Sequence, residues 1–220
     1  MTDRIELLTC ARRTADFARS CGFVPSLQNT FSYPSHLGAV MADSILQAGV
    51  NYQTVVFPRV KIILERYPDA VNLEGVNRII ATGLLPSFLR WNHHSKIERF
   101  ERLAEFFSSQ SVNTTCDLSR SISQSDFRAE LLSVFGVGRK TIDYMACLVG
   151  LDHVAVDRHV RRFVQRANVQ LESYESVQSV VGFAADLMGA GHREFDSWIW
   201  HFESKGAEAS KQVTMQKRAS

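Results

Sequence analysis

The sequence has 220 residues, of which 45% are hydrophobic and 22% are charged, so the chain can bury a core in one large domain or two small ones. Its 25 basic and 23 acidic residues give a formal charge of +2, a total too small to name a partner. No apolar stretch is long enough to cross a bilayer. These values indicate a globular protein and argue against a membrane-spanning one.

The first residues of the chain and the spacing of its cysteines both indicate in which cellular compartment the protein is found. Asp3 and Glu6 stand where a signal peptide would carry positive charge and an apolar run, so we expect a soluble intracellular protein. No two cysteines form a Cys-x-x-Cys pair, which favours reduced thiols over a zinc site or a disulfide framework. The four cysteines are Cys10, Cys21, Cys116 and Cys147.

Apolar residues recur at helical spacing along most of the chain, and no run of strict alternation indicates a strand. The clearest stripes fall, in chain order, at residues 37–45, 76–84, 97–107 and 177–188. Ser95 and Glu98 have the spacing of a capping box at the start of the third stripe. Polar composition predicts a long loop at 108–125 and a frayed tail from Gly206. We therefore predict an all-α protein of roughly nine or ten short helices.

The stretch FGVGRK, residues 135–140, places two glycines around one apolar residue. Apolar stripes on both sides of it predict a helix-hairpin-helix over about 127–149. Glycines allow backbone dihedrals closed to other residues and a close approach of the backbone to a ligand, while the second helix presents its N-terminus. The turn suits a phosphate of a nucleic-acid backbone, which such a contact positions without reading bases. The residues expected at this phosphate are Gly136, Val137, Gly138 and Arg139.

The same stretch can be compared with three other kinds of turn. A nucleotide P-loop needs glycine directly before lysine, whereas Arg139 precedes Lys140 here. A dinucleotide-binding turn needs a preceding strand and a third glycine. The two glycines alone are equally compatible with a helix–helix turn that binds no ligand.

A second basic segment, VAVDRHVRRFV, follows at residues 154–164. It predicts a helix with Asp157 at its N-cap and with Arg158 and Arg161 on faces available to DNA phosphates, although such a face is often only solvated. A helix over 139–149 is about 16 Å long, and an extended loop of seven residues spans up to about 23 Å. The loop is therefore long enough to place the Asp157 carboxylate beside the Lys140 amine. Alternatively, Asp157 only caps its helix.

The segment LLSVFGVGRKTIDYMACLVGLDHVAVDRHVRRFV, residues 131–164, resembles the signature of the helix-hairpin-helix DNA glycosylase superfamily, in particular its endonuclease III-like branch. Lys140 and Asp157 fall on the positions of the catalytic lysine and aspartate of that family. A weaker likeness extends from about Pro34 to Phe202. Within it, ILQAGVNY resembles the segment that inserts a wedge residue into the duplex, and Gln47 occupies the wedge position.

The resemblance implies two helical domains flanking a DNA-binding cleft. The expected domains are 28–150, a barrel-like helical domain that contains the hairpin, and 1–27 plus 151–220, a second helical domain formed by both chain ends. The implied partner is double-stranded DNA that contains a damaged or mismatched base or an abasic site, bound by a monomer. The implied location is the cytoplasm, at the nucleoid, or the nucleus.

The sequence departs from the family at several positions. Phe135 stands where proline is usual, Ile142 where alanine is usual, and Arg158 where threonine is common. Many relatives end in four cysteines that hold an iron–sulfur cluster, whereas no cysteine follows Cys147. We therefore expect no cluster, no other cofactor and no metal, and apolar packing of the last helices through residues 198–202.

The resemblance implies a bifunctional glycosylase with abasic-site lyase activity. The target nucleotide is flipped out, Gln47 fills the gap, and a neutral Lys140 amine attacks C1′ and leads to β-elimination. Asp157 orients the amine, accepts its proton and stabilises positive charge on the sugar. One alternative is a monofunctional enzyme in which Asp157 activates water and Lys140 contacts the backbone. Another is a non-catalytic DNA-binding hairpin module. The base that is removed is not identified by the sequence.

Overall fold

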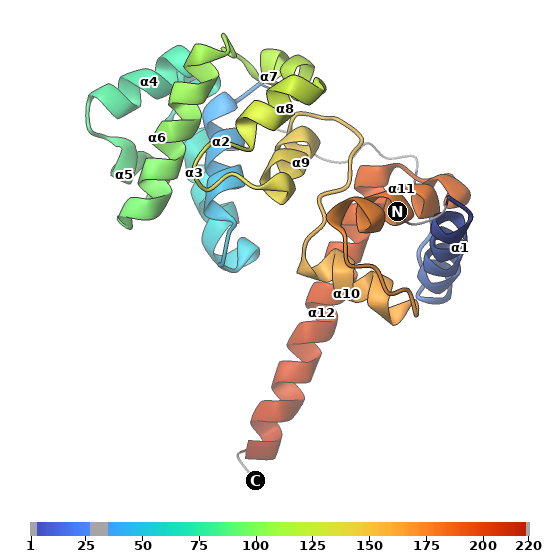
Figure 1. The fold of residues 1–220 in the computed structure, drawn as a ribbon. Coiled ribbons are helices and arrows are strands. Elements are labelled where there is room, and N and C mark those ends of the chain that lie inside the picture. The colour runs from blue at the N-terminus through green and yellow to red at the C-terminus, as the bar shows by residue number, and fades with distance from the viewer. Residues whose placement is uncertain (1–3, 27–34, 219–220) are drawn as a thin grey trace. The chain divides into compact units, whose positions relative to one another are not determined.

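The computed structural model describes residues 4–26 and 35–218, and these residues form helices and no strand (Figure 1), which confirms the predicted all-α class. The described part contains twelve α-helices, a π-helical turn η1 and a 3-10 turn η2, rather than nine or ten helices. None of these helices combines the length and the apolar content needed to span a membrane.

The chain divides into two compact units. Residues 31–151 form the central unit, and residues 1–30 together with 152–220 form the terminal unit. The sequence predicts two domains, 28–150 and 1–27 plus 151–220. That each of them is a separate domain remains a prediction.

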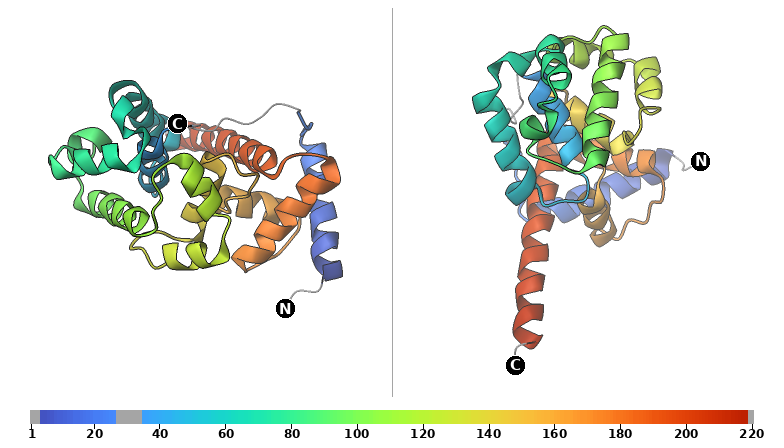
Figure 2. Two further views of the ribbon diagram at one scale, coloured as in Figure 1. Left: turned by 90° about the horizontal axis from the view of Figure 1, so that it is seen from above. Right: turned by 90° about the vertical axis from the view of Figure 1, so that its left-hand side faces the viewer.

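The central unit is built around a helix buried on all sides. Its elements are α2 (Leu37–Leu46), η1 (Tyr52–Val56), α3 (Phe57–Arg66), η2 (Pro68–Val71), α4 (Leu73–Ala81), α5 (Leu85–Leu89), α6 (His94–Ser109), α7 (Thr115–Ser121), α8 (Ser125–Leu131) and α9 (Arg139–Leu148). All ten residues of α2 are buried, and α3, α4, α6 and α9 pack around it (Figures 1 and 2). Because α2 ends at the predicted wedge segment and Lys140 lies in the first turn of α9, this packing sets the position of both.

A buried histidine fixes the start of α2. The Nδ1 atom of His36 accepts the amide of Ala39 at 3.1 Å, and its Nε2 lies 3.0 Å from the carbonyl oxygen of Tyr67. Burial lowers the pKa of His36, which favours the neutral ring. In that state the ring accepts at one nitrogen and donates at the other, so it caps α2 and ties it to the residue before η2.

The predicted loop at 108–125 is wrong, because α7 lies within it. Thr114 and Asp117 form a capping box, in which the Thr114 hydroxyl accepts the Asp117 amide at 3.1 Å and Asp117 accepts the Thr114 amide at 2.9 Å. The Thr114 hydroxyl and neighbouring amides hold the pKa of the Asp117 carboxyl below its usual value. This reciprocal cap stabilises a seven-residue helix whose composition alone indicates a loop.

Two other predicted helix ends also differ. The N-cap of α6 is His93, so Ser95 lies inside the helix and forms no capping box with Glu98. The predicted tail from Gly206 belongs to α12, which continues to Arg218.

The terminal unit consists of α1 (Arg4–Ser20), α10 (Arg158–Arg166), α11 (Tyr174–Met188) and α12 (His192–Arg218). The first helix packs on α11, and α10 packs on α12. Aromatic rings fill the core around Phe163, which lies 5.6 Å from Trp198 and 5.9 Å from Phe202 between ring centroids. The buried Glu203 carboxylate pairs with Arg166 at 2.8 Å and with Arg162 at 3.7 Å, which joins α10 to α12.

Candidate active site

The hairpin connects α8 to α9 through residues 132–138, which confirms the predicted helix-hairpin-helix motif. Val137 is buried and anchors the turn in the core of the central unit, while its neighbours Gly136 and Gly138 are exposed. No side chain caps α9, whose N-cap is Gly138. The turn therefore presents backbone at the start of a ten-residue helix.

The two glycines serve different purposes. Gly136 has a φ of +79°, which disfavours side chains, and a Cβ there would overlap the Arg99 side chain of α6. Arg99 also lies with its guanidinium carbon 5.6 Å from the ring centroid of the exposed Phe135. Gly136 is thus required by the fold of the hairpin itself.

Gly138 has no such internal reason. Its φ of −113° and ψ of 173° are open to any residue, and a Cβ there would meet no atom within 4 Å. The absence of a side chain leaves the backbone before α9 accessible from solvent. This position therefore allows the close approach of an external group.

Lys140 lies in the first turn of α9 and contacts the predicted wedge residue. Its Nζ donates to Oε1 of Gln47 at 2.8 Å, and Gln47 is the C-cap of α2. The amide Nε2 of Gln47 is buried and has no hydrogen-bond partner among the described residues. The structure therefore brings together Lys140 and Gln47, which the sequence places 93 residues apart.

A buried carboxylate supports the same part of the central unit. Asp43 on α2 is fully buried and accepts the hydroxyls of Tyr52 at 3.0 Å and Tyr144 at 3.1 Å. The Lys140 nitrogen lies 5.9 Å from the centroid of the Tyr144 ring. Tyr144 thus links α9 to α2 beneath Lys140. None of these three residues is predicted from the sequence as part of the site, because no local pattern relates Asp43 to Tyr144, 101 residues away.

Asp157 is the N-cap of α10, as predicted, and belongs to the terminal unit. Its Oδ1 accepts the amides of His159 at 2.7 Å and Val160 at 3.0 Å. Its Oδ2 lies 2.9 Å from Nδ1 of His159, a residue that no sequence motif marks as functional. His159 in turn lies edge-on to Trp200, with 5.9 Å between ring centroids. The carboxylate is therefore fixed by its own helix, and its pairing with Lys140 remains a prediction.

The arginines of α10 divide into two groups. Arg162 and Arg166 pair with Glu203, so they stabilise the terminal unit. Arg158 is exposed, and Arg161 donates to the carbonyl oxygen of Glu172 at 3.1 Å. Contacts of Arg158, Arg161 and Arg139 with DNA remain predictions.

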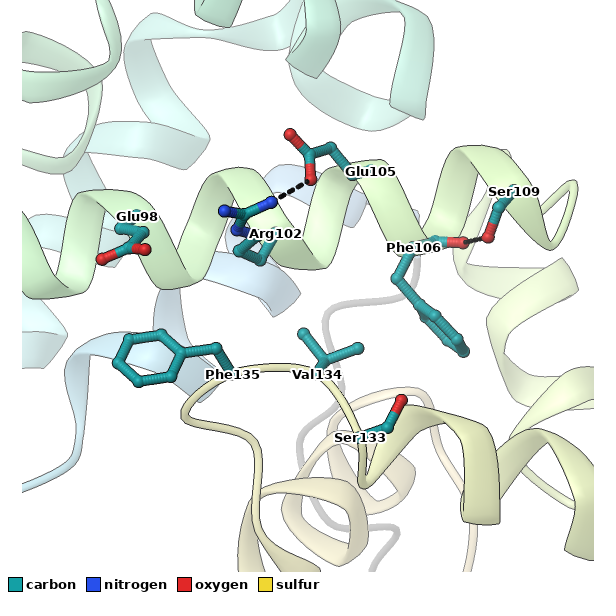
Figure 3. A pocket seen from close by; sticks show the side chains of 8 residues that line it. All are labelled: Glu98, Arg102, Glu105, Phe106, Ser109, Ser133, Val134 and Phe135. Carbon is teal, nitrogen blue, oxygen red and sulfur yellow. Dashed lines mark hydrogen bonds and ion pairs between the residues drawn. The ribbon is translucent and has the colours of Figure 1, made fainter.

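An open groove lies on the α6 side of the hairpin (Figure 3). Phe106 of α6 lies across it from Val134 of the turn, and Phe135 lies opposite Glu98. Arg102 pairs with Glu105 at 3.3 Å along its edge. Lys140 and Gln47 are not among its lining residues. The groove is therefore separate from the candidate site.

In the described ranges, no group of three or more His, Cys, Asp or Glu side chains is arranged to hold a metal ion. All four cysteines are free thiols: Cys10, Cys21, Cys116 and Cys147.

Comparison with known proteins gives a family and a fold. The sequence model of a family described as "Domain of unknown function (DUF8548)" matches residues 89–204, which is more than half of the chain. No curated protein matches the sequence. A crystal structure of H. pylori 3-methyladenine DNA glycosylase (MagIII) bound to 1,N6-ethenoadenine is similar over 93% of this chain and 99% of that chain, with a TM-score of 0.58 and 15% sequence identity. This similarity establishes the fold.

The two hairpin glycines predict different effects on stability. Gly136→Ala should lower the free energy of unfolding by about 2 kcal/mol, because alanine is disfavoured at positive φ and its Cβ displaces Arg99. Gly138→Ala should cost less than about 1 kcal/mol, since only a weaker N-cap preference is lost. Urea unfolding of both variants measures the difference, and equal losses would contradict the distinct roles of the two glycines.

The N-cap role of Asp157 predicts how two substitutions at this position change the stability of the protein. Asp157→Ala should destabilise the protein by about 1 kcal/mol through loss of the N-cap, whereas Asp157→Asn should cost less than about 0.5 kcal/mol because asparagine also caps helices. Thermal unfolding followed by circular dichroism tests this order. A large loss in both variants would show that the negative charge itself holds α10.

Proposed function

This chain belongs to the DUF8548 family, a domain of unknown function, and we propose that it is a DNA glycosylase of base excision repair with abasic-site lyase activity. The observation that carries the proposal is the position of Lys140. It lies in the first turn of the second hairpin helix, with its amine 2.8 Å from the side chain of Gln47. A nucleophile next to a wedge residue suits an extruded nucleotide.

The hairpin binds the backbone of double-stranded DNA in this proposal. A phosphate approaches Gly138, where no side chain obstructs it, and meets the positive end of α9 and the exposed Arg139. Gly136 and Val137 hold the shape of the turn. The contact fixes the position of the duplex and leaves base selection to other residues.

Gln47 acts at the vacated base position. A nucleotide inside a duplex is inaccessible at C1′, so it must leave the stack, and a side chain that fills the gap stabilises the flipped state. Gln47 lies at the end of the buried α2 and therefore projects from a rigid support. Its unpartnered Nε2 provides a donor for the orphaned base or the backbone.

Lys140 performs the covalent step as a neutral amine. Its nitrogen forms a bond to C1′ while the glycosidic bond breaks, and the base leaves with the bonding electrons. Loss of the amine proton and opening of the sugar give a Schiff base. Removal of a C2′ proton then breaks the C3′–O bond, and the 3′ phosphate leaves by β-elimination.

Asp157 supplies a fixed negative charge to this reaction. The hydrogen bonds from its own helix and the contact with His159 preset the orientation of the carboxylate. A preorganised carboxylate stabilises positive charge that develops on the sugar and can accept the proton of the amine. His159 is a positioning residue in this scheme.

The substrate that we propose is a duplex with a damaged or mismatched base, bound by one copy of the chain. The H. pylori enzyme of similar fold is named for a methylated purine, and its structure contains 1,N6-ethenoadenine. Both 3-methyladenine and 1,N6-ethenoadenine are modified bases, which supports a damaged base as the proposed substrate.

A monofunctional glycosylase is the second candidate. The Lys140 amine donates a hydrogen bond to Gln47, which a charged ammonium does well, and a charged Lys140 would contact a phosphate. Asp157 would then activate water for attack at C1′. The third candidate, a DNA-binding hairpin without catalysis, is favoured by the open backbone at Gly138 alone.

Borohydride trapping distinguishes the three candidates. With duplex DNA that carries an abasic site or single damaged bases, the wild-type protein should form a covalent adduct, and Lys140→Gln should form none because the Schiff base cannot form. Asp157→Asn should bind the same duplexes and react at least about a hundredfold more slowly. The adduct is measured as a band of reduced mobility in a denaturing gel.

The matched control for Lys140→Gln is Lys61→Gln, at an exposed lysine of α3. Base release without an adduct would select the monofunctional enzyme, and binding without either reaction would select the hairpin module. Retention of the adduct in Lys140→Gln would contradict the assignment of the nucleophile.

The open backbone at Gly138 makes a separate prediction for DNA affinity. Gly138→Ala should weaken binding roughly tenfold, or about 1.4 kcal/mol, because its Cβ stands between the backbone and a phosphate. The loss should be the same for duplexes of different sequence, as measured by fluorescence anisotropy at one salt concentration. Unchanged affinity would place the phosphate elsewhere.

A further inference from the structure

The turn that carries Gln47 is short and closely constrained at both ends. It follows α2 directly and leads to Asn51, whose side chain caps η1 by accepting the Thr54 amide at 3.0 Å. Within it, Gly49 has a φ of +78°, which glycine adopts at no steric cost. The local sequence thus defines the bend, while the carbonyl groups at the end of α2 need partners from elsewhere.

Those partners come from a lysine 50 residues away in sequence. Lys96 of α6 is only 8% exposed, and its Nζ donates to the carbonyl oxygens of Leu46 and, at 2.9 Å, of Ala48. These carbonyls belong to the residues directly before and after Gln47. The ammonium therefore holds the backbone on both sides of the wedge residue.

The Lys96 side chain is itself held in place. Its Nζ lies 4.8 Å from the centroid of the Trp91 ring, and the guanidinium carbon of Arg59 lies 5.2 Å from the same ring. The Nε of Arg59 donates at 3.1 Å to the carbonyl oxygen of Arg90. Trp91 and Arg59 thus form a second layer around Lys96, built from α3, α6 and the segment between α5 and α6.

We propose that Lys96 is a positioning residue that holds the 46–48 backbone rigid so that Gln47 can enter the DNA stack. The inference rests on the proposed role of Gln47 as the wedge. A side chain can displace a stacked base only if its own backbone does not yield, and hydrogen bonds to a charged donor resist such movement more than neutral ones. Lys96 touches neither the sugar nor the base in this proposal.

The environment of Lys96 gives this role a pH dependence. Burial, together with the positive charges of Arg99 on α6 and Arg59 on α3, lowers the pKa of Lys96 to about 8. Above that pH the amine loses its charge and binds the Leu46 and Ala48 carbonyls more weakly. Wedge insertion should therefore decline as the pH rises through about 8.

Global stability should change in the opposite direction. Because the pKa of Lys96 is lower in the folded than in the unfolded chain, the unfolded chain binds more protons between about pH 8 and the ordinary lysine value. The contribution of Lys96 to folding is thus unfavourable below about pH 8 and improves as the pH rises across that window. A loss of wedge insertion together with a gain in stability separates positioning from general unfolding.

The test uses the full chain and a duplex in which 2-aminopurine lies beside a tetrahydrofuran abasic-site analogue, so that no chemistry occurs. Insertion of a wedge disrupts stacking and raises the 2-aminopurine fluorescence. We compare the wild type with Lys96→Met, Lys96→Arg, Gln47→Ala and the exposed control Lys61→Met, between about pH 7 and pH 9. Hydrogen exchange of the Gln47 amide, which bonds to the Asp43 carbonyl oxygen, reports on the turn without DNA.

The expected result has three parts. Lys96→Met and Gln47→Ala lose most of the fluorescence rise, whereas Lys61→Met retains it. Lys96→Met also exchanges the Gln47 amide roughly tenfold faster, because two charge-assisted hydrogen bonds are lost. The wild-type rise declines near pH 8, and Lys96→Arg, which stays charged, shows no such decline.

Two results would overturn the inference. One is a Lys96→Met variant with wild-type fluorescence and wild-type exchange at Gln47. The other is the same pH profile for the wild type and Lys96→Arg. If Gln47→Ala keeps the full rise while Lys96→Met accelerates exchange, the wedge role of Gln47 has failed, and the Lys96 contact is shown to be structural only.

Discussion

The hydrogen bond between Lys140 and Gln47 is the contact on which the candidate site depends, because it joins the proposed nucleophile to the proposed wedge residue. Gln47 is the C-cap of α2, the fully buried helix of the central unit, and Lys140 lies in the first turn of α9, which packs on α2. The side chain proposed to enter the duplex and the amine proposed to attack the sugar therefore share one support. Any shift of α9 along α2 would therefore change the position of the Lys140 amine relative to Gln47.

Each side of this contact is stabilised by a different kind of interaction. On the α9 side, backbone geometry dominates: Gly136 adopts a positive φ beneath Arg99, and Val137 anchors the turn in the core. On the α2 side, a buried ammonium and a buried carboxylate dominate, through Lys96 at the 46–48 carbonyls and Asp43 between two tyrosines. Such buried polar groups are costly unless they are fully paired, so they specify one arrangement of the helices.

The sequence predicts the local features of this site well. Periodicity gives the helical class, two glycines give the hairpin, and the position of Asp157 before a basic helix gives its N-cap, since each depends on neighbours a few residues away. The helix α7 escaped prediction because a capping box overrides the loop-like composition of its segment. The contacts of Arg99 with Gly136 and of Lys96 with Leu46 were not predictable from local patterns, because they join segments more than 35 residues apart.

The pairing of α1 with α11 has a consequence for biosynthesis. The first helix of the terminal unit packs on one that follows it by more than 150 residues, whereas residues 31–151 contain all of the central unit. Emerging from the ribosome, α1 has no native neighbour until the hairpin has already been made. The central unit, with Gln47 and Lys140, can therefore fold before α11 is available to α1, and the terminal unit that bears Asp157 is completed last.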